Sequence, residues 1–259
     1  MSQLKELSPE EMQESYSKYF FMTMAEQPQD LLDEIKKGPM DSRNALPIEA
    51  RNELCKPGYL ASEVGYCSMP DGTAYASNIT LMPNVSKEMF QWWFVWHGLN
   101  PLRYKIWDPD DHFGLVTDKV EQLTNPDIPI KERIWGVTHR VNEDIGLGAE
   151  ELAIHFQSPE EMGFDVALME QHGVSIICAN LNDTMMCHTF RNKGTGIELR
   201  SRFWFGYNIE NKKVVRKIPQ DVVIPLDAAK GLTFHNVKEY SNLAKILPLV
   251  YLEEKDKFN

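Results

Sequence analysis

The sequence predicts an α+β domain in which a curved antiparallel sheet is crossed by one long C-terminal helix. Two observations predict this class. Strand-like segments separated by tight turns fill residues 174–218, and strands joined by short turns pair in the antiparallel sense. The longest helical stretch of the chain, Asp227 to Leu247, follows them. With 42% hydrophobic and 25% charged residues, the composition is that of a soluble globular domain.

Residues 1–85 are predicted to form a small, mainly helical N-terminal accessory region, and residues 86–259 the main domain. Glu10 to Met24 is expected to be helical, and Leu31 to Lys37 is expected to form a second, shorter helix. Frequent prolines and glycines then leave only short pieces of chain between them. One of these pieces, Tyr75 to Leu81, is a strand candidate.

Four of the six tryptophans fall between Trp92 and Trp107. Ser86 is a suitable N-cap for a helix that runs through Trp96. This stretch has two interpretations: an aromatic helix in the core, or the wall of a pocket for a flat, hydroxylated ligand. Composition alone favours the core helix.

A strand is predicted from Arg133 to Asn142, and its alternation places one set of side chains on the buried face. That set is Trp135, Val137, His139, Val141 and Glu143. A buried carboxylate is costly unless a cation lies near it. Glu143 is therefore expected to have a cation or a metal as its partner, unless the strand ends before it.

The second half of the chain alternates strands and turns after a short helix at Glu160 to Gln171. Strands are predicted at Val174 to Leu181, Met185 to Phe190, Ile197 to Tyr207 and Lys213 to Ile218. The C-terminal helix, stopped by Pro248, presents an inward stripe of Leu232, His235, Glu239 and Ile246. A curved sheet with one long helix laid across it is the helix-grip (Bet v 1-like, START-like) arrangement, which encloses a pocket.

His235 and Glu239 are four positions apart, so a helix brings both side chains to one face. Such pairs are common on helix surfaces, and this pair alone favours a surface interaction. The interpretation changes if Glu143 and His112, which sits in an acidic turn, point to the same place. Two imidazoles and two carboxylates form a suitable zinc site, which iron(II) or manganese also accepts.

The net charge of −11 argues against a nucleic-acid backbone or an anionic membrane surface as a partner. No apolar run approaches the roughly 20 residues that span a bilayer. The N-terminus shows no signal-peptide pattern, which predicts a cytoplasmic protein. The cysteines lack C-x-x-C spacing and are expected to be reduced core thiols: Cys55, Cys67, Cys178 and Cys187.

Four stretches of the sequence carry a further signal. They are Trp92-Trp93-Phe94-Val95-Trp96-His97, Leu102-Arg103-Tyr104-Lys105-Ile106-Trp107-Asp108-Pro109-Asp110-Asp111-His112, Trp135-Gly136-Val137-Thr138-His139 and Glu143-Asp144-Ile145-Gly146. They resemble the phloretin hydrolase and 2,4-diacetylphloroglucinol hydrolase family, from about Phe90 through the C-terminal helix. The resemblance implies a helix-grip homodimer with one zinc ion per chain and a small aromatic substrate. It also implies hydrolysis of the carbon–carbon bond between an acyl group and a phloroglucinol ring, which releases a carboxylic acid.

The resemblance also implies roles for individual residues. The metal ligands that it implies are His112, Glu143, His235 and Glu239. Tyr104 matches the family's pocket tyrosine, and His188 matches its pocket histidine on a central strand. A second family tyrosine has no clear counterpart, and Phe203 or Tyr207 lies nearest to it. If Phe203 is the match, one phenol contact is missing and the substrate preference is expected to differ.

The implied reaction is chemically reasonable. An aryl ketone resists hydrolysis, but a trihydroxylated ring can take a keto form and leave as a stabilised enolate. Zinc would polarise the carbonyl, Tyr104 would hold a ring hydroxyl, and a base is still needed for water. His188 and His139 are the candidate catalytic bases, although His188 is equally well a structural histidine and His139 fits a structural role better. Arg200 and Arg202 are expected to be sheet-face charges rather than substrate clamps.

Two other functions fit parts of this pattern. Helix-grip proteins also serve as non-catalytic carriers of hydrophobic aromatic ligands, but a carrier needs no set of four metal ligands. A non-haem iron oxygenase uses two histidines and one carboxylate, so a second carboxylate leaves fewer open positions on the metal. The sequence does not distinguish an acetyl from an arylpropanoyl group as the acyl part.

Overall fold

A computed structural model describes residues 6–258 of the chain. Its strands are β1 (Gly65–Ser68), β2 (Ala74–Met82), β3 (His112–Thr117), β4 (Thr138–Asp144), β5 (Ala149–Gln157), β6 (Ser175–Leu181), β7 (Thr184–Lys193), β8 (Gly196–Phe205), β9 (Tyr207–Glu210) and β10 (Lys213–Arg216). Its α-helices are α1 (Gln29–Lys36), α2 (Lys87–Trp96), α3 (Pro101–Lys105), α4 (Val120–Thr124), α5 (Val166–His172) and α6 (Leu226–Glu254). Short 3-10 helices are η1 (Glu11–Gln13), η2 (Ser17–Phe21), η3 (Ser42–Asn44), η4 (Ile48–Cys55), η5 (His97–Leu99) and η6 (Ile130–Glu132).

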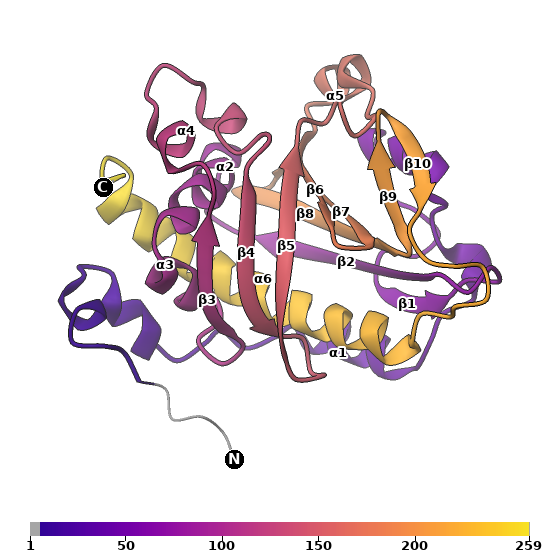
Figure 1. Cartoon of the computed structure of the whole chain (residues 1–259), viewed down its shortest axis with the longest axis horizontal. Coiled ribbons are helices and arrows are strands. Elements are labelled where there is room, and N and C mark those ends of the chain that lie inside the picture. The colour runs from indigo at the N-terminus through magenta and orange to yellow at the C-terminus, as the bar shows by residue number, and fades with distance from the viewer. Residues whose placement is uncertain (1–5, 259) are drawn as a thin grey trace.

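The strands form one curved sheet that arches over the long helix α6, with α2 and α3 near the C-terminal half of that helix (Figure 1). The order along the sheet is β1-β2-β8-β7-β6-β5-β4-β3, and neighbours on this path pair in the antiparallel sense. The β9–β10 hairpin joins the sheet beside β7. The predicted α+β helix-grip fold is confirmed.

Both faces of the sheet are covered. The concave face packs against α2 and α6 through residues such as Phe90, Trp93 and Leu243. The convex face is covered by η4 and α5, and its separate core contains Leu54 and Trp204. The predicted reduced core thiols are confirmed, since Cys55, Cys67, Cys178 and Cys187 are free and buried in this outer core. The site therefore has to be sought between the concave face and α6.

The helix α6 continues through Pro248 to Glu254, beyond the end predicted at Leu247. A proline removes one N–H donor and usually ends or kinks a helix. Here Leu247 and Val250, on either side of Pro248, are both 0% exposed, so packing into the core outweighs the lost hydrogen bond. The predicted inward stripe is confirmed, with Leu232 partly buried and His235, Glu239 and Ile246 buried.

Two predictions for the N-terminal region are wrong. The segment from Glu10 to Met24 forms η1 and η2 rather than one α-helix, and its buried aromatic residues, among them Tyr16 and Phe20, pack into the main core. The strands β1 and β2 are part of the main sheet, and β2 pairs with β8 along its whole length. The sheet therefore begins at Gly65, and residue 85 is not a domain boundary.

The elements that carry the site agree better with the prediction. The Ser86 side chain accepts a hydrogen bond from the Met89 N–H at 3.1 Å, which confirms the predicted N-cap of α2. In β4, the predicted alternation is confirmed because His139, Val141 and Glu143 are buried, although the strand starts at residue 138. The strand β5 was not predicted, since one of its faces stays largely exposed.

Among residues 6–258, we find no helix that combines the length and the apolar character needed to cross a membrane.

Candidate metal centre and cavity

The four predicted metal ligands converge at one end of the space between the sheet and α6. His112 at the start of β3 is paired in register with Glu143 on β4, while His235 and Glu239 come from successive turns of α6. The two histidine Nε2 atoms are 3.3 Å apart. The His112 Nε2 atom lies 3.9 Å from Glu143 Oε2 and 3.8 Å from Glu239 Oε2. All four residues are buried, at most 9% exposed.

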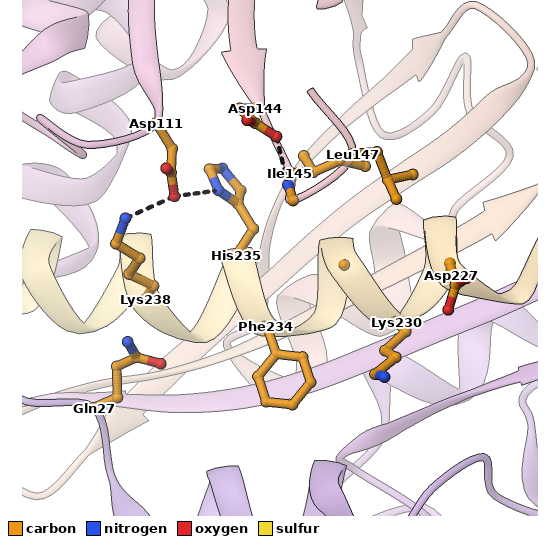
Figure 2. Close-up of a pocket in the computed structure, with 12 residues that line it drawn as sticks. Gln27, Asp111, Asp144, Ile145, Leu147, Asp227, Lys230, Phe234, His235 and Lys238 are labelled. Atoms are coloured by element: carbon orange, nitrogen blue, oxygen red, sulfur yellow. Dashed lines mark hydrogen bonds and ion pairs between the residues drawn. The ribbon is translucent and has the colours of Figure 1, made fainter. Parts of the chain in front are cut away.

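Each histidine is oriented by a partner on its other ring nitrogen. The Nδ1–H group of His112 donates to the Tyr104 carbonyl oxygen at 3.2 Å, and the His112 ring stacks on the Tyr104 ring. The Nδ1 atom of His235 faces the Asp111 carboxylate at 3.6 Å, as Figure 2 shows. Partners of this kind fix the tautomer of a metal-binding histidine. Both Nε2 atoms are thereby directed at the same point.

This donor set fits a divalent cation. Atoms of His112, Glu143 and His235 lie within 4.8 Å of one another, and the Glu239 carboxylate approaches the same point. Two imidazole nitrogens and two carboxylates that face each other away from water repel one another unless a cation lies between them. Mixed nitrogen and oxygen ligands without thiolate suit zinc, and also iron(II) or manganese. These four side chains therefore form a site that is able to hold a metal ion.

The pKa values reflect the crowding of these groups. Burial lowers the pKa of His112 well below its usual value. Burial, together with the charge of Glu143, raises the pKa of Glu239 well above its usual value. Burial also lowers the pKa of His235, but its contact with Asp111 and the charges of nearby carboxylates outweigh this and raise it to about 9. The carboxylates thus favour a positive charge at this point.

A second group of charges supports the centre from outside. The Lys238 ammonium, one turn after His235, lies 2.6 Å from Asp111, as Figure 2 shows. It also lies 3.0 Å from Asp108 and 3.2 Å from Asp110. Asp108 is 0% exposed and accepts from the lysine through one oxygen. Its backbone oxygen accepts from the His112 N–H at 2.8 Å. The acidic turn that precedes His112 is thereby fixed against α6.

A small cavity of about 50 Å³ adjoins the centre. It is lined by Tyr104, Glu143, His235 and Glu239 of the centre and by apolar residues, among them Ile154, Leu181, Met186, Phe203 and Leu232. A space of this size holds only a few water molecules. A ring-sized ligand therefore requires some of the lining side chains to move.

A larger and more open pocket, about 560 Å³, lies on the outer side of His235. Figure 2 shows it along the first turns of α6, where Phe234, Lys230 and Leu147 surround it. His235 lines both spaces, so its ring is part of the wall between them. Its Nε2 atom faces the metal centre, and its Nδ1 atom faces Asp111 on the outer side.

The structure brings most of the predicted catalytic and substrate-binding residues to the inner cavity, but not all. Tyr104, His139, His188 and Phe203 line it. Tyr207 does not, because it lies beyond the end of β8, where its hydroxyl donates to the Asp71 carboxylate. Its prediction as a substrate-binding residue is corrected accordingly. Arg200 and Arg202 also lie away from the cavity and pair with Glu63 on the convex face, as expected of sheet-face charges.

Tyr104 has a different contact from the one predicted. Its hydroxyl donates to Glu143, one of the candidate metal ligands, and both side chains are buried. Burial and the neighbouring charge of Glu143 raise the pKa of Tyr104 well above its usual value, so the phenol keeps its proton. Tyr104 therefore holds a ligand carboxylate before any substrate is present.

The two candidate bases differ in access. In His139, the Nε2 atom faces backbone, since a Cβ atom on Gly98 would lie 2.4 Å from it, and it has no hydrogen-bond partner. In His188, Nδ1 lies 2.8 Å from the Ser201 hydroxyl and Nε2 lies 3.0 Å from the Tyr240 hydroxyl. Burial lowers the pKa of His188 to about 3, so it is neutral. The geometry favours His188 over His139 as the group that reaches a ligand.

Sequence reasoning gave no individual role to three residues of the site. They are Tyr240, which lines the cavity from α6, Asp111, which faces His235, and Trp107, whose indole N–H donates to the Glu239 carbonyl oxygen at 3.0 Å. A signal existed for Tyr240, because it stands eight positions after Leu232 on the inward stripe of α6. Of the aromatic run, Phe94 and Trp107 line the cavity, whereas Trp92, Trp93 and Trp96 belong to the core.

Comparisons with known proteins point in one direction. Residues 46–252 match the family model described as DAPG hydrolase PhiG domain. Phloretin hydrolase from Eubacterium ramulus is 37% identical over 256 residues, which cover 96% of this chain and 93% of that protein. A 2,4-diacetylphloroglucinol hydrolase from a Pseudomonas species is 28% identical, over 92% of this chain and 87% of that protein.

A solved structure of norcoclaurine synthase from Thalictrum flavum is similar at a TM-score of 0.35 and 13% identity, over 72% of this chain and 91% of that one. A likeness at this level carries no argument about function.

Proposed function

This chain belongs to the DAPG hydrolase PhiG domain family, and we propose that it is a zinc-dependent hydrolase of acylphloroglucinols. The bond cleaved joins the acyl carbon to the phloroglucinol ring, as in phloretin or 2,4-diacetylphloroglucinol, and a carboxylic acid is released. One observation carries the proposal: a buried His–Glu–His–Glu donor set adjoins a small cavity lined by aromatic side chains. A carrier of the same fold has no use for such a set.

The metal would be held by His112, Glu143, His235 and Glu239. When bound, the ion would act as a Lewis acid towards the acyl carbonyl. The rest of the work falls to the chain itself. Tyr104 fixes Glu143 through its hydroxyl and His112 through its carbonyl oxygen. Trp107 holds the backbone of Glu239, and Asp111 faces His235, so each of the four candidate ligands is held in place by a neighbour.

The cavity supplies the conditions that the ring needs. Phe94, Trp107 and Phe203 form apolar walls that exclude bulk water, and exclusion of water strengthens every polar contact inside. A ring with three hydroxyls reacts from its keto form, because the electron pair of the broken bond is then received as an enolate. His188 is neutral and lines the cavity, and its Nε2 atom contacts the Tyr240 hydroxyl, so it would take a proton from the attacking water through that hydroxyl.

The test is a metal analysis of the purified protein together with a comparison of four substrates at matched concentrations. These are phloretin, 2,4-diacetylphloroglucinol, an aryl ketone with one ring hydroxyl, and a phenyl ester. We expect one zinc per chain, release of the acid from the two trihydroxylated ketones, and poor turnover of the other two. Comparable rates on the ester and the ketones would contradict the proposal, and tight binding without turnover would identify a carrier.

A further inference from the structure

A row of hydrogen bonds crosses the cavity from the sheet to the helix. It begins at Ser201 on β8, passes through His188 on β7 and ends at Tyr240 on α6, with separations of 2.8 Å and 3.0 Å. Ser201 and Tyr240 are each 1% exposed and His188 is 2% exposed. Both ring nitrogens of His188 are therefore occupied by protein hydroxyls.

Two arrangements of protons satisfy this row. In the first, the Tyr240 hydroxyl donates to Nε2 and the Nδ1–H group donates to Ser201. In the second, the Ser201 hydroxyl donates to Nδ1 and the Nε2–H group donates to the Tyr240 oxygen. The Tyr240 oxygen keeps an unused acceptor site in the first and an unused donor in the second. Either arrangement leaves this phenol able to bind one more polar group.

Tyr240 is the hydroxyl that remains available in this cavity. Among the described residues that line it, two carry hydroxyl groups, Tyr104 and Tyr240, and the Tyr104 hydroxyl donates to Glu143. Apolar rings also surround His188. Its ring centre lies 5.8 Å from that of Phe203 and 6.2 Å from that of Phe94. A polar substituent on a ring bound here would find its partner at Tyr240.

We propose that Tyr240 recognises one ring hydroxyl of the substrate and that the same phenol positions His188. This inference rests on the proposed function, because it names the contact by which that site selects a polyhydroxylated ring. Tyr240 directly follows the candidate ligand Glu239 on α6, so the helix holds the Tyr240 phenol in a fixed position relative to the candidate metal site. The acyl carbonyl and the ring hydroxyl would thus be placed by adjacent residues of one helix.

The experiment pairs one protein change with one ligand change. Equilibrium affinities of the zinc-loaded protein are measured for 2,4,6-trihydroxyacetophenone, 2,4-dihydroxyacetophenone and 2,6-dihydroxyacetophenone. Tyr240→Phe should weaken the trihydroxylated ligand about tenfold, the size expected when one net hydrogen bond is lost. It should leave unchanged the affinity for the dihydroxylated ligand that lacks the contacted hydroxyl. Zinc content and thermal unfolding of the variant are measured alongside.

The matched control is Tyr251→Phe, the same substitution on the same helix at a tyrosine whose hydroxyl contacts Glu88 at 3.0 Å, outside the cavity. It should change none of the three affinities. Equal weakening of all three ligands by Tyr240→Phe, or no weakening of any, would overturn the inference. If the wild-type protein binds these ligands but hydrolyses no acylphloroglucinol, the proposed reaction fails, while the comparison of affinities still decides the role of Tyr240.

Discussion

Both faces of the sheet bury charged side chains, but the partners of these side chains differ between the two faces. On the convex face, the Glu63 carboxylate contacts Arg200 at 2.7 Å and also pairs with Arg202. Nearby, Glu198 contacts Arg191 at 2.6 Å. Each carboxylate of this face meets a guanidinium in a fixed geometry, so its charge is balanced within the protein.

On the concave face, four ionisable side chains that can all ligate a metal are directed at one point. The Lys238 ammonium stands on the outer side of His235, where it pairs with three aspartates of the acidic turn. Glu143 and Glu239 accept hydrogen bonds from the Tyr104 hydroxyl and the Asn236 amide, which are neutral. A carboxylate that meets a guanidinium has its charge balanced within the fold, whereas carboxylates and imidazoles directed at one point are suited to bind a cation. Burial alone does not separate the two cases, but the partners do.

The largest effect should follow from removal of a ligand on the concave face. His235→Ala or Glu239→Ala takes away one of four donors that face a single point, and each variant should lose its bound zinc. Without the metal, turnover should fall by several orders of magnitude, since each 1.36 kcal/mol of barrier is about tenfold. The measurement is zinc content by atomic absorption together with kcat.

The control for this change is Glu253→Ala, on the same helix, where an exposed carboxylate pairs with Lys18 at 2.7 Å. It should keep one zinc per chain. A sharper test uses the metal-free proteins, because the buried Glu239 carboxylate should then lower the stability of the fold. Glu239→Gln should unfold at the same temperature as the metal-free wild type or above it. Full zinc occupancy in either ligand variant would remove that residue from the centre.

On the convex face, removal of a carboxylate is expected to lower the stability of the protein without changing its zinc content. Glu63→Gln leaves two buried guanidinium groups without their counter-charge, and breaking a buried pair in this way costs about 3–5 kcal/mol. Denaturant unfolding should show this loss, and zinc content should stay the same. Glu53→Gln is the control, because its ion pair with Lys56 is exposed and should be worth about 1 kcal/mol or less. Equal losses in both variants would contradict the comparison.

Local signals explain how much of this molecule was predictable. The N-cap at Ser86, the alternation in β4 and the spacing of His235 and Glu239 are set by neighbours in sequence, so they were readable. The helix-grip fold followed from the turns and the long last helix. The failures depend on distant contacts: α6 passes Pro248 because the core holds both sides of it, and β2 is fixed by β8 rather than by the residues around it.

The site was predictable to the same extent. The four candidate ligands were chosen from spacing and from the resemblance to a family, and the structure brings them together, but the partner of each was not predicted. Asp111 reaches His235 because the acidic turn packs against α6. Tyr240 reaches His188 because α6 packs with this side chain towards the sheet. Tyr207, chosen for its nearness in sequence, lies on the other side of a turn. Contacts between elements cannot be inferred from one sequence by spacing alone.

A smaller effect should appear in the pH dependence of stability. Burial lowers the pKa of His97 to about 4, and its Nδ1–H group donates to the Trp93 carbonyl at 2.7 Å. The unfolded chain binds a proton near pH 6.5 while the folded protein does not. The stability that His97 contributes is thus fully present above pH 6.5 and is lost as the pH falls towards 4, by about 3 kcal/mol in total.

His97→Gln cannot take up a proton, so its unfolding free energy should fall less between pH 6.5 and 4 than that of the wild type. Urea unfolding at several pH values measures this slope. The partly exposed His172, in the last turn of α5, gives the control: His172→Gln should leave the slope unchanged. An identical slope in His97→Gln and the wild type would mean that His97 is not held neutral by the fold.

The smallest effect is expected for Asp111, which faces the outer ring nitrogen of the candidate ligand His235. The Asp111 carboxylate lies 3.6 Å from His235 Nδ1, and the Lys238 ammonium holds it there (Figure 2). Loss of such an orienting partner typically reduces metal affinity 10- to 100-fold, so Asp111→Asn should weaken zinc binding by about that factor in competition with a chelator. Asp110→Asn changes the adjacent aspartate, whose side chain is 43% exposed and contacts Lys238 at 3.2 Å, and should alter the affinity much less. If the two variants weaken zinc equally, the acidic turn acts through its total charge, and the centre would then resemble the balanced face more than its geometry indicates.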